Sequence, residues 1–178
     1  MKGLVIYKGR YGATKQYAMW IGQELQLPVA SADRFPTDEL SKYDYFIIGS
    51  SVYIGKLEIK KWVTRNFNVL LSKKNFFFQV AGTPVNEKEK REAYNKTAIP
   101  LAILTKAETF FLPGRMIIRN LSRFDRFMLK MGAKLSKDPV EKKNMLTEYN
   151  DVKKENILPL IEAVKRFSEV SEPKMELA

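Results

Sequence analysis

Short apolar runs that alternate with helical patterns constrain this chain more than any other feature. The run at residues 45–49, Tyr-Phe-Ile-Ile-Gly, is apolar on both faces, as buried parallel strands are. Apolar residues at helical spacing follow the first apolar run of the chain, residues 4–7; they are Tyr17, Ala18, Ile21 and Leu25. The predicted strands are residues 4–7, 28–31, 45–49, 75–81 and 109–112, and the predicted helices are residues 14–25, 59–71, 87–104 and 151–167, with an interruption at Pro100 and a kink at Pro159.

Five strands that alternate with helices predict an α/β fold in which a doubly wound parallel sheet has right-handed crossovers. The 178 residues fit one domain, which we expect over residues 1–170, with a flexible tail at 171–178. Residues 113–150 break the alternation and are too many for a plain connection. We therefore expect an inserted segment there, either functional in itself or an added subdomain.

The absence of two residue types limits the chemistry. The chain has no Cys and no His, which removes thiolate nucleophiles, the commonest general base and the commonest transition-metal ligand. Zinc sites and Ser-His-Asp hydrolysis are excluded, and no metal site is expected. An enzyme of this composition would depend on an organic cofactor.

The formal net charge of +11 bears on the partners. It favours an anionic partner, which is nucleic acid, an acidic membrane or a polyanionic small molecule, against the alternative of plain solubility. Nucleic acid is not expected, because no recognised nucleic-acid-binding motif is present. No apolar run approaches the ~20 residues that cross a bilayer, and no signal peptide is recognisable. We expect a cytoplasmic protein, with contact to the inner face of the cell membrane left open.

Residues 9–14, Gly-Arg-Tyr-Gly-Ala-Thr, lie between the first strand and a helix N-terminus. Converging backbone N–H groups and the helix dipole make such a loop an anion site, although the spacing G-x-x-G-x-T alone is equally typical of a turn. Two more loops follow the third and fourth strands, and ligands of open α/β sheets bind at this edge. The candidate binding residues are Gly9, Arg10, Tyr11, Gly12, Ala13 and Thr14, then Ser51, Val52, Tyr53, Ile54 and Gly55, then Ala81, Gly82 and Thr83.

This arrangement of three loops resembles the flavodoxin family. The resemblance implies a five-stranded sheet of order 2-1-3-4-5 and an FMN cofactor, whose phosphate lies in the first loop and whose isoalloxazine ring lies between the other two. Hydroxyl residues are usual where this chain has Gly9, Arg10 and Tyr11, so that Thr14 and Gly12 alone keep the family's pattern. Arg10 either adds a charge-assisted hydrogen bond to the phosphate or points to solvent.

A branch of that family, the menaquinone-dependent protoporphyrinogen IX dehydrogenases of haem biosynthesis, is more similar still. The similar residues are 44–51, 53–56 and, most specifically, Phe-Asp-Arg-Phe-Met-Leu-Lys at 124–130 within the insertion. This resemblance implies an FMN-dependent oxidoreductase that passes electrons from a porphyrinogen to a quinone. The alternatives are a non-enzymatic flavodoxin-like electron carrier or FMN-binding protein, and a binding module that has lost FMN.

The insertion carries its own pattern. Between residues 115 and 143 stand nine basic and three acidic side chains, a net charge of +6. Ser122 and Asp125 resemble a capping box that opens a helix to about Leu135. On that helix an apolar row and a basic row recur at helical spacing; the apolar row is Leu121, Phe124, Met128, Met131 and Leu135, and the basic row is Arg119, Arg123, Arg126, Lys130, Lys134 and Lys137.

Three interpretations of this helix remain open. Its apolar row packs on the domain while its charges are solvated, or the helix lies on an anionic membrane surface, or it forms a lid whose arginines hold substrate carboxylates. The candidate substrate-binding or membrane-binding residues are Arg119, Arg123, Arg126 and Lys130.

Overall fold

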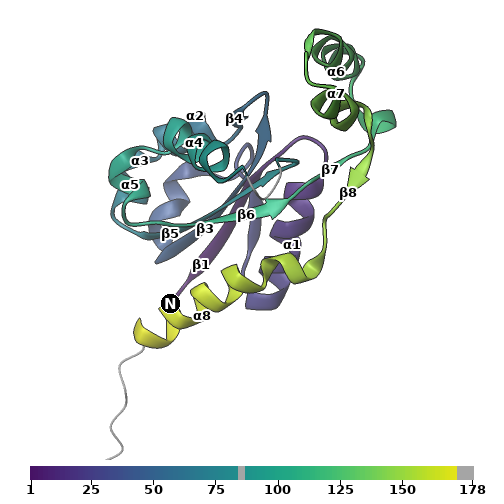
Figure 1. Cartoon of the computed structure of the whole chain (residues 1–178). Coiled ribbons are helices and arrows are strands. Elements are labelled where there is room, and N and C mark those ends of the chain that lie inside the picture. Colours follow the sequence, from purple (N-terminus) through teal and green to yellow (C-terminus); the bar gives the residue numbers. More distant parts are fainter. Residues whose placement is uncertain (84–86, 172–178) are drawn as a thin grey trace, which may run out of the picture.

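A computed structural model describes residues 1–83 and 87–171 and has one parallel sheet at its centre (Figure 1). The strand order is β2-β1-β3-β5-β6, which confirms the predicted α/β fold with the order 2-1-3-4-5 of its parallel strands. A short strand, β4, adds an antiparallel hairpin to the end of β3. The strands are β1 (Gly3–Lys8), β2 (Val29–Ser31), β3 (Tyr45–Tyr53), β4 (Lys56–Leu57), β5 (Lys74–Ala81) and β6 (Glu108–Pro113).

Helices cover both faces of the sheet, and each face has its own buried cluster. Alternate residues of β1 point to opposite faces, so that Leu4 and Ile6 belong to one cluster and Val5 to the other. The first cluster lies under α2 (Lys60–Arg65), α3 (Phe67–Leu71), α4 (Lys88–Ala98) and α5 (Leu101–Leu104), and the second lies under α1 (Ala13–Leu25) and α8 (Leu158–Ser171).

Two helix predictions are wrong in detail. The helix expected at 59–71 is divided at Asn66, whose side-chain amide donates to the Trp62 carbonyl (2.9 Å). The closing helix begins at Leu158 rather than at 151, after a 3-10 turn at Lys154–Ile157. Pro159 therefore lies in the first turn of α8, where proline sacrifices no helical hydrogen bond, and no kink is needed. The interruption expected at Pro100 is confirmed between α4 and α5.

The insertion is a ribbon that carries a pair of helices. Strand β7 (Arg115–Met116) pairs antiparallel with β8 (Tyr149–Asn150), and between them lie a 3-10 turn (Ile118–Asn120), α6 (Arg123–Leu135) and α7 (Pro139–Leu146). Figure 1 shows α6 and α7 standing apart from the α/β body, beyond the end of the sheet. A further 3-10 turn, Thr37–Lys42, precedes β3. Of the tail expected at 171–178, residues 172–178 lie outside the described residues.

Helix α6 does not pack on the domain through its apolar row. The predicted cap is confirmed, because the Asp125 N–H donates to Ser122 Oγ (3.0 Å). Phe124 and Leu135, however, are 61% and 74% exposed, whereas Asp125 and Ala133 are buried. The helix therefore turns Asp125 and Ala133 inward with Leu129 half-buried, whereas Phe124, Phe127 and Leu135 face solvent. The interpretation in which this row is covered by the domain is wrong.

Candidate functional site

A cavity of about 480 Å³ lies where β1, β3 and β5 end, and the insertion closes its other side. Its volume suits a cofactor-sized ligand. Ten of the fourteen predicted binding residues line it, namely Arg10, Tyr11, Ala13, Thr14, Ser51, Val52, Tyr53, Ile54, Ala81 and Gly82. Gly9, Gly12, Gly55 and Thr83 belong to the same loops without lining the cavity. The insertion contributes cavity-lining residues that are not among the fourteen predicted ones, above all Arg115, Asp125 and Tyr149.

The first loop delivers a helix N-terminus to this cavity. Gly12 caps α1 with φ 84°, a left-handed conformation that glycine adopts without strain. The first turn of α1 has no acidic residue and no side-chain cap, so that the positive end of the helix dipole is not neutralised locally. Gly9 packs tightly, since a Cβ there would lie 2.6 Å from Thr14 Oγ1. The loop is thus shaped as an anion site.

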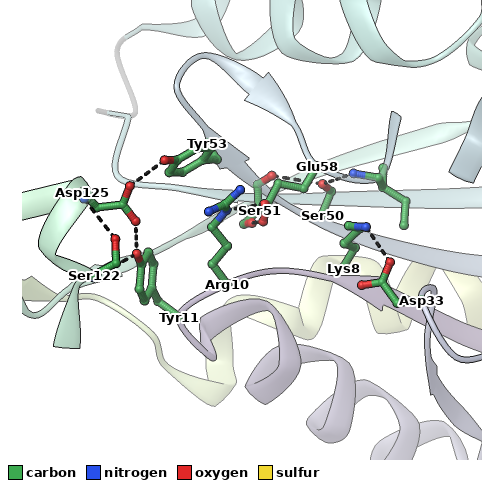
Figure 2. A network of polar contacts seen from close by, with 11 residues as sticks. Lys8, Arg10, Tyr11, Asp33, Ser50, Ser51, Tyr53, Glu58, Ser122 and Asp125 are labelled. Atoms are coloured by element: carbon green, nitrogen blue, oxygen red, sulfur yellow. Dashed lines mark hydrogen bonds and ion pairs between the residues drawn. The ribbon is translucent and has the colours of Figure 1, made fainter. Parts of the chain in front are cut away.

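Arg10 is held by Glu58, a residue that the sequence gave no reason to single out. Its Nε lies 2.5 Å from Glu58 Oε1, and Ser51 Oγ donates to the other carboxylate oxygen (2.6 Å), as Figure 2 shows. The Arg10 guanidinium also stacks over the Tyr53 ring at 3.8 Å. The hydrogen bond to Glu58 raises the pKa of Arg10 above its ordinary value. Arg10 therefore supports the Tyr53 ring and shares its charge with Glu58.

Asp125 joins the insertion to two of the three loops. Its carboxylate accepts hydrogen bonds from the hydroxyls of Tyr11 and Tyr53, the latter at 2.5 Å (Figure 2). Burial alone would raise the pKa of Asp125, but the hydrogen bonds from the two tyrosines and Ser122 outweigh it and hold the pKa below the ordinary value. The hydrogen bond to Asp125 in turn raises the pKa of Tyr53. The ionised Asp125 carboxylate thus anchors α6 to the first and second loops beside the cavity.

Tyr149 of β8 forms another wall of the cavity. A Cβ on Gly82 would lie 1.8 Å from the Tyr149 hydroxyl, so that a residue other than glycine there would displace the ring. Burial raises the pKa of Tyr149. The ribbon is tied to the sheet nearby, because the Gly114 N–H donates to the Ala81 carbonyl (2.8 Å). The loop after β5 and the insertion therefore meet at this wall.

The four predicted residues of the basic row lie elsewhere. Arg119, Arg123, Arg126 and Lys130 are exposed and do not line the cavity. They share the insertion with what we call the α6 apolar face, which consists of Phe124, Phe127, Met128, Met131 and Leu135, each at least 36% exposed. The structure therefore places these cations beside an exposed apolar surface.

Two kinds of feature are absent from residues 1–83 and 87–171. No helix in this part is long and apolar enough to cross a membrane. No group of three acidic side chains there is arranged to hold a metal ion.

A family model and two individual proteins show what this chain is similar to. A family model described as a flavodoxin domain matches residues 4–143. Protoporphyrinogen IX dehydrogenase (quinone) of Escherichia coli strain K12 is 24% identical over 146 residues, which cover 76% of this chain and 81% of that protein. The crystal structure of the flavodoxin, WrbA-like protein from Agrobacterium tumefaciens matches with a TM-score of 0.51 and 16% identity, over 71% of this chain and 91% of that one.

Proposed function

Because the chain belongs to the flavodoxin domain family, we propose that it is an FMN-dependent oxidoreductase that passes electrons from an anionic substrate to a quinone. One observation carries the proposal: a single cavity joins an anion-ready helix N-terminus to an aromatic wall, at the edge where this sheet order places FMN. The insertion that closes the cavity gives the enzyme a surface that a plain electron carrier does not require.

The residues present fit FMN. Its phosphate is a dianion, which suits the N-terminus of α1 behind Gly12. Its flat ring suits the space between Tyr53 and the loop at Ala81 and Gly82. When bound, FMN would supply the redox chemistry, since it accepts two electrons together and releases them singly or as a pair.

The protein would supply position and electrostatics. Tyr53 is fixed from two sides, because Arg10 stacks on its ring and Asp125 accepts from its hydroxyl. Asp125 is the single acidic side chain among the described residues that line the cavity, and the hydroxyls of Tyr11 and Tyr53 already donate to it. The cations Arg10 and Arg115 line the same cavity, which favours an anionic ligand there.

The substrate and the acceptor follow from the relative and from the insertion. The Escherichia coli relative is by name a dehydrogenase of protoporphyrinogen IX with a quinone, and a porphyrinogen carries anionic propionates. Long-chain quinones dissolve in membranes. The α6 apolar face, flanked by Arg123, Arg126, Lys130 and Lys134, has the composition of a helix that binds an anionic membrane surface. We therefore propose peripheral binding at the inner face of the cell membrane.

The test is anaerobic oxidation of protoporphyrinogen by the FMN-loaded protein with a water-soluble quinone analogue. Turnover that requires both FMN and the quinone would support the proposal. If the loaded protein is reduced and reoxidised by chemical reagents without turning over the porphyrinogen, the substrate assignment fails and an electron carrier is indicated. A protein that takes up no FMN at micromolar concentration would remove both functions.

A further inference from the structure

Two positive groups meet at the phosphate end of the cavity. One is the N-terminus of α1, and the other is the guanidinium of Arg115 on β7. Arg115 Nη2 donates a long hydrogen bond to the Tyr11 carbonyl (3.4 Å), and a Cβ on Gly12 would lie 2.9 Å from the same nitrogen. A cation next to a helix N-terminus is electrostatically unfavourable, and an anion between the two would reverse the sign of the interaction.

The backbone fixes Arg115 in this place. Arg115 pairs with Asn150 in the β7–β8 ribbon. The preceding Gly114 forms backbone hydrogen bonds with both Ala81 and Asp151. A Cβ on Gly114 would lie 3.1 Å from the Ala81 carbonyl carbon, so the ribbon approaches β5 as closely as glycine allows. The guanidinium is therefore delivered to the loop by a strand.

Arg115 and Arg10 differ in their partners. Arg10 forms an ion pair with Glu58 at 2.5 Å. In the part of the chain that the structure describes, no carboxylate lies within ion-pairing distance of Arg115, which is half-buried in the cavity wall. Of the two arginines that line the cavity, Arg115 is the one whose charge is not already matched.

We propose that Arg115 is the charged ligand of the FMN phosphate. It replaces the Ser and Thr hydroxyl donors that are absent where the loop has Gly9, Arg10 and Tyr11. A guanidinium presents a planar fork of donors that matches a phosphate and compensates its charge. The insertion then contributes to cofactor affinity as well as to closing the cavity. This inference rests on the proposed FMN site.

The experiment compares FMN with riboflavin, which has the same ring and no phosphate. Cofactor-free wild type, Arg115→Gln, Arg115→Lys and Arg65→Gln are titrated with each flavin, and the dissociation constant is taken from the flavin fluorescence. Arg65 is the matched control, because it is an exposed arginine on α2 outside the cavity.

We expect Arg115→Gln to weaken FMN binding by roughly 10- to 100-fold, as the loss of a charge-assisted hydrogen bond predicts, and to leave riboflavin within about 3-fold. Arg115→Lys keeps the charge without the fork of donors, so its affinity for FMN falls between those of wild type and Arg115→Gln, and Arg65→Gln equals wild type. Unchanged riboflavin binding also shows that the variant is folded.

Two results would overturn the inference while leaving the FMN site intact. One is wild-type affinity of Arg115→Gln for FMN, and the other is an equal loss for both flavins, which would make Arg115 a structural residue. Failure of wild type itself to bind FMN would overturn the proposed function, and this inference with it.

Discussion

Replacing Phe124 and Phe127 by serine should detach the protein from membranes. The two side chains are 61% and 58% exposed. A phenylalanine buries roughly 200 Å² when fully covered, so that about 240 Å² is available on the pair. At about 25 cal/mol per Å², the complete transfer of this exposed area out of water contributes at most ~6 kcal/mol. A helix lying in the interface covers about half of that area, which leaves ~3 kcal/mol, or about 100-fold in the partition coefficient.

The assay is co-sedimentation with lipid vesicles that contain an anionic lipid. Leu101→Ser is the matched control, because Leu101 is 73% exposed on α5, in the α/β body rather than on the insertion. We expect wild type and Leu101→Ser to bind alike and the double phenylalanine variant to bind about 100-fold more weakly. Equal binding of the double variant and wild type, or an equal loss in Leu101→Ser, would refute the assignment of the α6 apolar face as the membrane surface.

Three further predictions address the basic side chains of α6, the hydrogen bonds of Asp125, and the turn between β3 and β4. Arg126→Gln with Lys130→Gln should weaken binding to anionic vesicles by ~2 kcal/mol, about 1 per cation, and leave neutral vesicles unaffected; an equal effect on both lipids would contradict this. Because the pKa of Asp125 is depressed in the folded protein, its stabilising contribution is present above the ordinary carboxyl pKa and is lost as the pH falls through the lowered value. Asp125→Asn should therefore make the unfolding midpoint less dependent on pH below about pH 4. An unchanged pH dependence of the midpoint would rule out a stabilising role for the hydrogen bonds of Asp125. Ile54 has φ 46° and the next residue, Gly55, has φ 70°, a turn conformation that disfavours β-branched residues. Ile54→Asn should therefore stabilise the cofactor-free protein against urea by ~1 kcal/mol, whereas Ile54→Val should not. Equal urea midpoints of Ile54→Asn and wild type would exclude strain at this position.

The sheet and the meeting of its loops could be predicted because both depend on local patterns. Apolar runs such as residues 45–49 mark buried strands, and right-handed crossovers bring the ends of parallel strands to one edge. The predicted sheet order and the flavodoxin resemblance are confirmed. The loop residues from Arg10 to Thr14 accordingly lie close to Ser51 and Ala81 around one cavity.

The contacts that complete the site depend on residues far apart in the sequence. Tyr11 and Asp125 are separated by 114 positions, and Arg10 and Glu58 by 48. Neither pair has a local pattern that indicates its partner. The spacing of Ser122 and Asp125 correctly indicated a helix start, yet that spacing concerns the backbone N–H and gives no information about where the carboxylate points.

The exposed apolar face of α6 shows how the two sides of one helix acquire different tasks. Apolar periodicity normally marks the buried side of a helix, but here Asp125 and Ala133 are buried while Phe124 and Leu135 are exposed. The tyrosine hydroxyls that bind Asp125 fix the rotation of the helix about its axis. With that rotation fixed, Asp125, Leu129 and Gly132 lie on the side toward the cavity, and Phe124, Phe127 and Leu135 face outward. Met128 belongs to the α6 apolar face and also lines the cavity, so that a membrane bound to this face would lie next to the cavity wall. On the proposed function, a lipid-soluble quinone would then approach the flavin around α6 rather than through the α/β body.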